Sequence, residues 1–398
     1  MKILYHHRTF ATDGQEVHIR SLQRGFQETG CVVREVALVP KGVGRFDAGL
    51  LGRGQRIQRM ILPRVLTLPA PLREVAEYAY SPFGVRRIVS ANRGFDADIL
   101  YERYAFGNRA GALASRKMSL PFVLEVNSPL VDELADTRGI VFGALARRIE
   151  RFIFSSADLV CVVSDQLRQI LERTGVPPDR MIVVQNGVHL ERFSTSITAE
   201  QRAAARAQVG VMGSAEAVVV GFVGYFRRWH GLDLLIRAWS TCRRDDGHLV
   251  LVGAGEGASR IQSLAADLGV VDRVHLVGAR PLEQIPDLLA ALDVAVLPAI
   301  TPYSSPLKLV EYMAASRAIV APDQANIHEL VQDGESALLF TAGSEQELAG
   351  ALQTLIDDRG LRERLGRAAR ATVERRQLTW RANAQKIRDV LAERSLLA

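Results

Sequence analysis

Short runs of apolar, often β-branched residues recur along the chain and alternate with longer stretches in which apolar residues return every three or four positions. The short runs predict buried strands, and the longer stretches predict amphipathic helices. In the N-terminal half the predicted strands are KILYH, VVREVAL, DILYE, PFVLEV, DLVCVVS and MIVVQ. The helical stretches between them cover residues 15–29, 105–117, 140–156 and 164–174.

The C-terminal half repeats this alternation. Its predicted strands are AVVVGFVG, HLVLVGAG, RVHLVG, DVAVLP, AIVAP and ALLF. Its helical stretches lie near residues 231–245, 256–269, 282–292, 306–315, 343–358 and 360–376. Apolar strands that alternate with helices are typical of parallel sheets covered on both faces. The sequence therefore predicts an α/β protein with two doubly wound, Rossmann-like domains.

The join between the two halves is also visible. Residues 186–217 begin with turn residues and continue as a polar, Ala- and Gln-rich stretch. We therefore predict one domain over residues 1–193 and a second over residues 194–376. A last amphipathic stretch, residues 377–398, is expected to form a helix that packs back on the first domain.

Composition narrows the class of protein. The chain has 398 residues, of which 48% are hydrophobic, enough for two globular domains. Its cysteines are odd in number and widely spaced, which favours a reducing compartment. No apolar run approaches the roughly 18 to 20 residues that cross a bilayer, and the N-terminus lacks a signal-peptide pattern. We therefore expect a cytoplasmic protein.

Positive charge is concentrated in residues 45–95, which hold nine arginines against Asp47, Glu74 and Glu77. Arginines alternate there with Ile, Met and Leu, a pattern that suits an anionic membrane surface and predicts peripheral contact with the inner face of the plasma membrane. A solvated arginine-rich face explains the pattern equally well, because the chain has few lysines. No aromatic-interleaved basic motif indicates nucleic-acid binding.

Candidate chemistry follows the predicted strands, because open parallel sheets bind ligands beyond the carboxyl ends of their strands. Gly224 ends one strand and is followed by Arg227, Arg228 and His230. Glycine lets a ligand approach the backbone, and guanidinium groups match phosphate oxygens, so this loop predicts a diphosphate clamp. Arginines that merely face solvent are an equally weighted alternative. Gly14, ahead of the first helix, is either a second phosphate contact or, slightly favoured, an ordinary loop glycine.

The segment TPYSSPLKLVEYMAAS predicts a ligand site at the start of a helix. Ser304, Ser305 and Pro306 precede the helix, whose first amides and dipole attract anions. Lys308 adds a cation, and Glu311, one turn on, can accept hydrogen bonds from a ribose diol. Phosphate and ribose one turn apart match a nucleoside diphosphate. The less favoured alternative is a Lys308–Glu311 surface pair, worth about a few tenths of a kcal/mol.

Taken together, several segments resemble a family 4 glycosyltransferase of the GT-B fold, the retaining, nucleotide-sugar-dependent class. These segments are VVSDQLRQIL…GVPPDRMIVVQNGVHLERF, VGYFRRWHGLD, LVGAGEG, VHLVGARPLEQIPDLLAALDVAVLPAI, SPLKLVEYMAASRAIVA and HELVQDGESALLF. The resemblance covers nearly the whole chain. It implies two Rossmann-like domains that face each other across a cleft, the N-terminal one for the acceptor and the C-terminal one for the donor.

The resemblance also implies roles for residues. Glu311 would bind the ribose, Arg227 and Lys308 would lie near the diphosphate, and the backbone from Gly278 to Arg280 would meet the base. The other implied donor-site residues are Gly14, Gly224, His230, Tyr303, Ser304, Ser305 and Leu307. Such enzymes keep the anomeric configuration and need no metal or other cofactor, because side chains and helix dipoles neutralise the leaving diphosphate. That diphosphate can itself take the proton of the acceptor hydroxyl.

The chain departs from the family pattern at Tyr303, at Tyr225 and His230, and at His189, where the family has an Asp after the Asn-Gly pair. The first of the family's two glutamates falls on Tyr303, which leaves the donor sugar open. The family's phosphate-binding Arg and Lys fall on Tyr225 and His230, so we expect Arg227 and Lys308 to replace them, with His230 contributing if it is protonated. Asn127, in LEVNSP, occupies the place of a polar catalytic residue, although it also suits a turn before a proline.

A second catalytic candidate is His18, which is equally an ordinary helix residue. Rival functions remain open at this point. A nucleotide-sugar epimerase of the same fold would need a pair of catalytic acids, and a nicotinamide dehydrogenase would need a complete glycine fingerprint. A catalytically inactive nucleotide- or carbohydrate-binding partner of another transferase is compatible with Tyr303. The favoured function is sugar transfer to a sugar or lipid-linked acceptor in bacterial cell-surface polysaccharide or glycoconjugate assembly.

Overall fold

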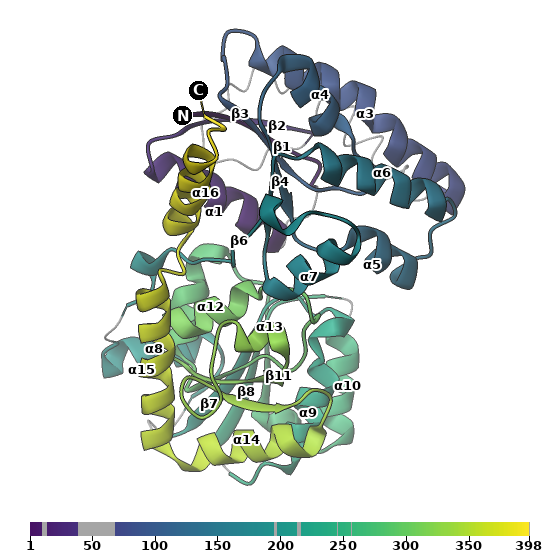
Figure 1. Ribbon diagram of the computed structural model, residues 1–398. Helices are drawn as coiled ribbons and strands as arrows, with labels where there is room; N and C mark the ends of the chain where they lie inside the picture. Colours follow the sequence, from purple (N-terminus) through teal and green to yellow (C-terminus); the bar gives the residue numbers. More distant parts are fainter. Residues whose placement is uncertain are drawn as a thin grey trace, which may run out of the picture. The chain divides into compact units, whose positions relative to one another are not determined.

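The computed structural model describes residues 1–9, 14–38, 68–194, 197–212, 216–244, 246–255 and 257–397. The strands among them form two six-stranded parallel sheets. The chain divides into two compact units: unit 1 comprises Met1–Gln185 and Trp380–Ala398, and unit 2 comprises Asn186–Thr379. The predicted α/β class, with two doubly wound domains, is confirmed (Figure 1).

The sheet of unit 1 has the strand order β2-β1-β3-β4-β5-β6. Its strands are β1 (Lys2–His7), β2 (Val32–Ala37), β3 (Ile99–Arg103), β4 (Phe122–Val126), β5 (Leu159–Val162) and β6 (Met181–Val183). Its helices are α1 (Gly14–Glu28), α3 (Ala70–Asn92), α4 (Ala110–Met118), α5 (Leu130–Thr137), α6 (Gly143–Ser156), α7 (Asp165–Arg173) and α16 (Trp380–Glu393).

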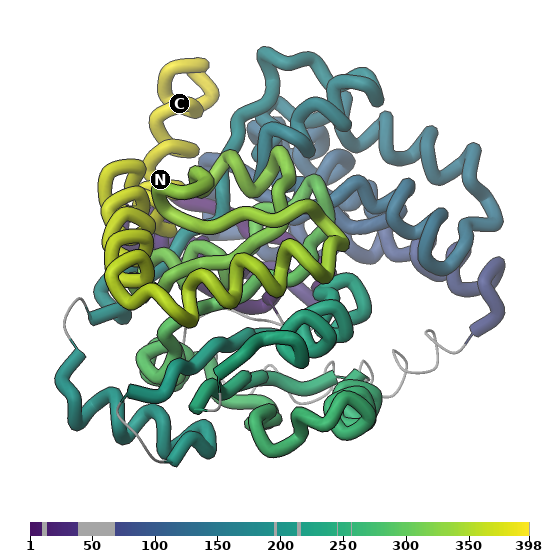
Figure 2. Tube along the Cα trace, turned by 90° about the horizontal axis from the view of Figure 1, so that it is seen from below, coloured from purple at the N-terminus to yellow at the C-terminus, as the bar shows by residue number. Residues whose placement is uncertain are grey.

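The sheet of unit 2 has the strand order β12-β11-β10-β7-β8-β9. Its strands are β7 (Val218–Val223), β8 (Gly247–Val252), β9 (Val274–Gly278), β10 (Val294–Val296), β11 (Ala318–Asp323) and β12 (Leu338–Thr341). Its helices are α8 (Ala199–Gln208), α9 (Leu232–Thr241), α10 (Ala258–Asp267), α11 (Ile285–Ala290), α12 (Leu307–Ala314), α13 (Ala325–His328), α14 (Glu345–Asp357) and α15 (Arg359–Arg376). The helices α14 and α15 follow each other along this unit (Figures 1 and 2).

Both faces of the unit 2 sheet are buried, which explains why its strands are apolar at nearly every position. Val218, Val220 and Phe222 of β7 pack on one side, in a cluster with α9, α10 and α14. The alternate residues Val219 and Val223 pack on the other side, in a cluster with α8, α11 and α12. Side chains of a strand alternate between faces, so the run supplies two cores at once.

In unit 1 the C-terminal helix α16 packs against α1 (Figure 1). The Asn383 side chain donates to the carbonyl of Gln185 at 2.7 Å, and Lys386 Nζ donates to the carbonyl of Val183 at 2.9 Å. Gly25 permits the close approach, because a Cβ there would lie 2.4 Å from the carbonyl oxygen of Trp380. The terminal helix therefore belongs to unit 1.

The division differs from the predicted boundary at residue 193. Residues 186–193 lie in unit 2, because the Asn186 amide donates to Ser305 Oγ at 3.0 Å and the Val188 amide donates to the carbonyl of Leu378 at 3.0 Å. The stretch 199–208, interpreted as part of a polar connection, forms α8. Its start is fixed by a capping box between Thr198 and Gln201.

The long helix α3 was not predicted, because the interpretation of residues 45–95 stopped at their charge. Its sequence carries Pro82 and Gly84, which usually interrupt helices. Residues 45–67 of that arginine-rich stretch lie outside the described residues. Within the described part of the chain, no helix combines the length and hydropathy needed to cross a membrane. The cysteines Cys31, Cys161 and Cys242 are buried thiols.

Replacing Gly25 by Ala should lower the thermal unfolding midpoint, because the added methyl group overlaps the backbone of α16. Overpacking of this kind costs about 1 to 3 kcal/mol. The matched control is Gly350→Ala in α14, where nothing lies within 4 Å of the added Cβ, and which should raise stability by about 0.5 to 1 kcal/mol. Equal midpoints for the two variants would show that α1 and α16 do not approach so closely.

Candidate active site

The topological switch point of unit 2 lies between β7 and β10, where the strand order reverses direction. Counted within the unit, the order is that of dinucleotide-binding folds, in which ligands bind beyond the carboxyl ends of the strands at this point. The loops that follow β7 and β10 hold Gly224 to Gly231 and Leu297 to Pro306. The predicted donor-site residues of unit 2 lie in these loops, in the first turns of α12 and just after β9.

Gly224 and Lys308 are in contact, although 84 residues separate them in the sequence. Gly224 has a φ of +145°, and a Cβ at this position would lie 2.9 Å from Lys308 Nζ. The Lys308 ammonium also lies 4.3 Å from the centroid of the Phe222 ring. Lys308 therefore points across the switch point towards the glycine loop. Among the described residues, no ion pair joins it to Glu311.

His230 holds this lysine from the other side. Its Nδ1 lies 2.6 Å from the carbonyl oxygen of Tyr225, and its Nε2 lies 3.0 Å from Lys308 Nζ. Burial, with repulsion from Lys308, lowers the pKa of His230 to about 3. The imidazole is therefore neutral, donates from Nδ1 and accepts from the ammonium at Nε2. The predicted contribution of His230 requires a protonated ring, and burial and the charge of Lys308 both oppose that protonation.

Burial also perturbs the two ionisable residues of α12. It lowers the pKa of Lys308 to about 7, an effect that Glu311 opposes. It raises the pKa of Glu311 to about 7, against the attraction of Arg192 and Lys308. Among the described residues, no hydrogen-bond donor reaches the Glu311 carboxylate. Half-buried ionisable residues with shifted pKa values, at the switch point of a sheet, are typical of a functional site.

The amino end of α12 carries no cap. Pro306 occupies the N-cap position and offers no side-chain acceptor, and the first backbone bonds begin at the amide of Leu309. The amides of Leu307 and Lys308 therefore have no backbone acceptor in the described chain. Uncapped amides and a nearby cation make this end of the helix suitable for an anion.

The loop serines fix the backbone ahead of α12. The Ser304 hydroxyl donates to the carbonyl of Thr301 at 3.0 Å, and Ser305 Oγ accepts from the Asn186 amide at 3.0 Å. The Asn326 side chain donates to the carbonyl of Ser304 at 2.8 Å. Tyr303 is half-buried in the same loop. These contacts position the amides of α12. The sequence placed the serines ahead of this helix but did not show that they hold its backbone.

The remaining donor-site candidates of unit 2 lie at its surface. The Arg227 guanidinium lies 5.8 Å from the ring centroids of both Tyr225 and Trp229. Gly278, with a φ of +76°, ends β9, and Arg280 is exposed just beyond it. All of them follow strands at the same edge of the sheet as Lys308.

In unit 1 the two catalytic candidates meet at one buried carboxylate, that of Glu125. Asn127 Nδ2 donates to Glu125 Oε1 at 2.5 Å, and His18 Nδ1 lies 3.4 Å from the same oxygen. Arg103 Nη1 donates to it at 2.5 Å and lies 3.2 Å from His18 Nδ1. His18 also packs edge-on against Trp380 of α16. Two residues that are 109 positions apart in sequence thus share a partner.

Sequence reasoning missed Glu125 and its neighbours. Tyr101 and Tyr5 donate to Glu125 Oε2 at 3.0 and 3.3 Å, so five side chains surround the carboxylate. His18 and Arg103, together with Asn127 and Tyr101, hold the pKa of Glu125 below its usual value against the effect of burial. The signal lay in the strand segments DILYER and FVLEV, which place charged residues where an apolar run ends.

Two further buried pairs lie at the carboxyl end of β1. His6 contacts Glu102, and its Nε2 lies 3.1 Å from the hydroxyl of Tyr80, while His7 Nε2 lies 2.7 Å from Glu35 Oε1. Gly14 is exposed and opens α1, directly after residues outside the described set. The switch point of unit 1, between β1 and β3, is therefore lined by buried titratable groups.

Comparison with known proteins agrees with this geometry. The family model "Glycosyl transferase 4-like domain" matches residues 13–187, and the model "Glycosyl transferases group 1" matches residues 213–372. The D-inositol 3-phosphate glycosyltransferase of Acidothermus cellulolyticus is 30% identical over 76% of this chain and 69% of its own. The enzyme of that name from Corynebacterium aurimucosum is 27% identical over 75% of this chain and 72% of its own.

Among solved structures, Anabaena HepE in complex with UDP has a TM-score of 0.72, with 22% sequence identity, and the match covers 99% of this chain and 100% of HepE. The chain belongs to the family 4 glycosyltransferases, which transfer sugars from nucleotide sugars and have the GT-B fold. It is an enzyme of the glycosyltransferase class.

Stability should fall as the pH is lowered from 6.5 towards 4. Burial lowers the pKa of His18 to about 4, whereas the unfolded chain titrates near 6.5. Between these values the unfolded state binds more protons, so the free energy of unfolding decreases with falling pH, by up to about 1.4 kcal/mol per pH unit from this residue. Denaturant unfolding at pH 7, 6 and 5 measures this free energy for the protein and for His18→Asn. The free energy of unfolding should depend less steeply on pH in the variant. Parallel slopes would contradict the buried neutral imidazole.

Proposed function

We propose that unit 2 binds a UDP-sugar at its switch point and that the enzyme transfers the sugar with retention of anomeric configuration and without a metal ion. The observation that carries this proposal is the contact between Lys308 Nζ and Gly224 in front of the uncapped α12. A diphosphate at this place would meet an ammonium, free helix amides and a glycine backbone. UDP is favoured as the nucleotide part of the donor because HepE, which shares the fold, holds UDP in its crystal structure.

Each donor-site residue has a distinct task in this proposal. Lys308 neutralises the leaving diphosphate, and His230 orients the ammonium by accepting one of its hydrogens. Glu311, one helical turn on, accepts the ribose hydroxyls with a carboxylate that no described donor occupies. The backbone from Gly278 to Arg280 receives the base. Arg227 adds charge from the loop after β7.

The acceptor is assigned to unit 1, at the carboxyl ends of β1, β3 and β4. Asn127 is proposed to contact the acceptor, with its amide group fixed by Glu125. His18, neutral and next to Arg103, is proposed to line the same place. The leaving phosphate accepts the proton of the attacking hydroxyl, since no described carboxylate of this cluster is free to act as a base. The relatives named above act on an inositol phosphate, which supports a hydroxyl acceptor on a polar ring.

The acceptor is further proposed to be lipid-linked, in the assembly of a cell-surface polysaccharide or glycoconjugate, with α3 in contact with the membrane. An exposed stripe along α3 contains Leu72, Val75 and Phe83, which are 55%, 52% and 49% exposed. Arg86 is exposed on the same side of the helix, at a spacing that continues the stripe. Apolar side chains flanked by arginine suit the interface of an anionic bilayer.

Calorimetric titration with UDP, GDP, ADP and dTDP, each with and without magnesium, tests the donor site. We expect micromolar binding of UDP that magnesium does not change. Glu311→Gln keeps the shape of the side chain but removes its charge, and should weaken UDP binding by about 1.5 to 3 kcal/mol, the value of hydrogen bonds to a charged group. Unchanged affinity in a folded variant would show that the ribose does not bind at Glu311. Product analysis with UDP-sugars then separates an active transferase from an inactive binding partner.

Liposome flotation at low salt tests the α3 stripe. The protein should float with vesicles containing anionic lipid and should be released as salt rises, because surface charges are screened. The triple variant Leu72→Gln, Val75→Gln, Phe83→Gln should lose most of this binding. Val271→Gln, a comparably exposed apolar residue of unit 2 at 47%, is the control and should bind as the unmodified chain does. If the triple variant still bound the vesicles, the α3 stripe would not be the membrane contact.

A further inference from the structure

A cavity of about 740 Å³ lies at the edge of the unit 2 sheet opposite the donor site. Its lining includes Ala217, Asp293 and Arg317, which directly precede β7, β10 and β11. Because all strands of this sheet are parallel, their amino ends share one edge and their carboxyl ends share the other. Lys308 and Glu311 follow carboxyl ends, so the cavity is separate from the donor site.

Arginine dominates the charge of this cavity. The basic residues of its lining come from α8, from the turn before β11 and from α15, and they are Arg202, Arg206, Arg317, Arg359, Arg362 and Arg367. The acidic residues are Glu216, Asp293 and Glu363. Six guanidinium groups thus face three carboxylates around one concave surface. An excess of positive charge in a concave site raises the local concentration of anions.

The carboxylates of the lining are largely occupied by structural contacts. Asp293 accepts from Arg202 at 3.0 Å, from Arg206 at 2.8 Å and from the Val219 amide at 2.8 Å. Glu363 contacts Arg359 at 3.0 Å. These pairs fix Arg202 and Arg206 of α8 and Arg359 of α15, and they leave Arg317 and Arg362 to other partners.

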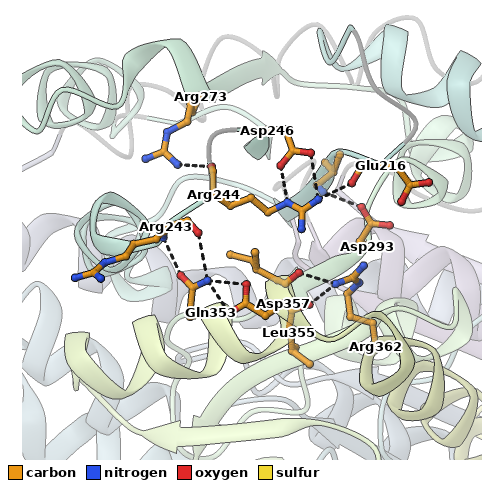
Figure 3. Close-up of polar contacts among 12 residues, drawn as sticks. Glu216, Arg243, Arg244, Asp246, Arg273, Asp293, Gln353, Leu355, Asp357 and Arg362 are labelled. Carbon is orange, nitrogen blue, oxygen red and sulfur yellow. Dashed lines mark hydrogen bonds and ion pairs between the residues drawn. The ribbon is translucent and has the colours of Figure 1, made fainter.

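Arg317 and Arg362 are held by neutral carbonyl groups. Arg317, which is 8% exposed, donates to the carbonyls of Ala315 and Leu292, both at 2.7 Å. Arg362 Nη1 donates to the carbonyls of Leu355 and Ile356 at 2.5 and 3.0 Å (Figure 3). Carbonyl contacts orient a guanidinium group without cancelling its charge. Arg317 uses two of its nitrogens in this way and Arg362 uses one, so each keeps donors for a ligand.

The surroundings make these two cations costly. Burial, followed by repulsion from Arg202, lowers the pKa of Arg317 to about 10 despite the nearby Asp293. Burial also lowers the pKa of Arg362, with Arg244 and Arg359 adding repulsion. Arg244 itself pairs with Asp246 and donates to the carbonyl of Glu216 at the border of the cavity (Figure 3). A bound anion would relieve this repulsion.

We propose that this cavity is a second binding site of the enzyme, specific for a small molecule that carries a phosphate or diphosphate group. Its volume falls in the range of about 300 to 1,000 Å³ usual for small-molecule sites. Planar guanidinium groups bind phosphate oxygens through paired hydrogen bonds, and several of them converge here from separate elements. The site does not depend on the donor site or on sugar transfer.

Calorimetric titration with inorganic pyrophosphate, at ionic strength held constant with KCl, tests the proposal. The full chain carrying Lys308→Met serves as the background, because this variant lacks the ammonium of the donor site. We expect saturable binding of one pyrophosphate. The double variant Arg359→Gln, Arg367→Gln should weaken it at least tenfold, because both side chains line the cavity.

The matched control is Arg364→Gln. Arg364 lies on the same helix and donates to the carbonyl of Gly334 at 3.0 Å, but it does not line the cavity. Its affinity for pyrophosphate should stay within twofold of the background. If the double variant unfolds, Arg362→Gln provides a second test, and it should lose a comparable share of the affinity for pyrophosphate. Absence of saturable binding, or equal weakening by Arg364→Gln, would overturn the proposal. UDP binding by the chain with Lys308 intact reports separately on the donor site.

Discussion

Parallel pairing of every described strand is the constraint on which the rest of this molecule depends. It buries both faces of each sheet, which is why the strand segments are apolar at successive positions. It also gathers all carboxyl ends at one edge and all amino ends at the other. Polar groups that would be costly in the middle of the sheet accumulate at the strand ends and in the loops beyond them. Both candidate sites of unit 2 and the polar cluster of unit 1 follow from this arrangement.

The environment of Lys308 shows how tertiary contacts override local sequence patterns. Spacing along α12 allows an ordinary pair with Glu311, worth little in water. The fold instead places the ammonium between His230 and the Phe222 ring, where burial lowers its pKa to about 7. The carboxylate of Glu311 is left without a described donor. A lysine and a glutamate that are kept apart in this way are both available to a ligand.

Sequence patterns predicted the class of fold and most strands, because apolar β-branched runs and glycine-containing turns are local signals. They also identified Lys308 and Glu311, which lie in the first turns of the helix that follows β10. They did not predict α3, in which Pro82 and Gly84 argue against a helix that packing nevertheless stabilises. They did not find Glu125 as the partner of His18 and Asn127, because four of its five neighbours come from distant segments. They could not show that burial and the neighbouring Lys308 oppose the protonation of His230.

The two edges of the unit 2 sheet solve the same electrostatic problem differently. At the carboxyl edge a single lysine and the free amides of α12 leave room for an anion. At the amino edge Asp293 pairs with both arginines of α8, whereas Arg317 and Arg362 are held by carbonyl oxygens. Keeping Arg317 charged at a buried position, with Arg362 half-buried nearby, costs desolvation energy that apolar side chains would avoid. An anion that binds there would explain this cost. Packing of the core does not explain it, because apolar side chains would fill the same space without it.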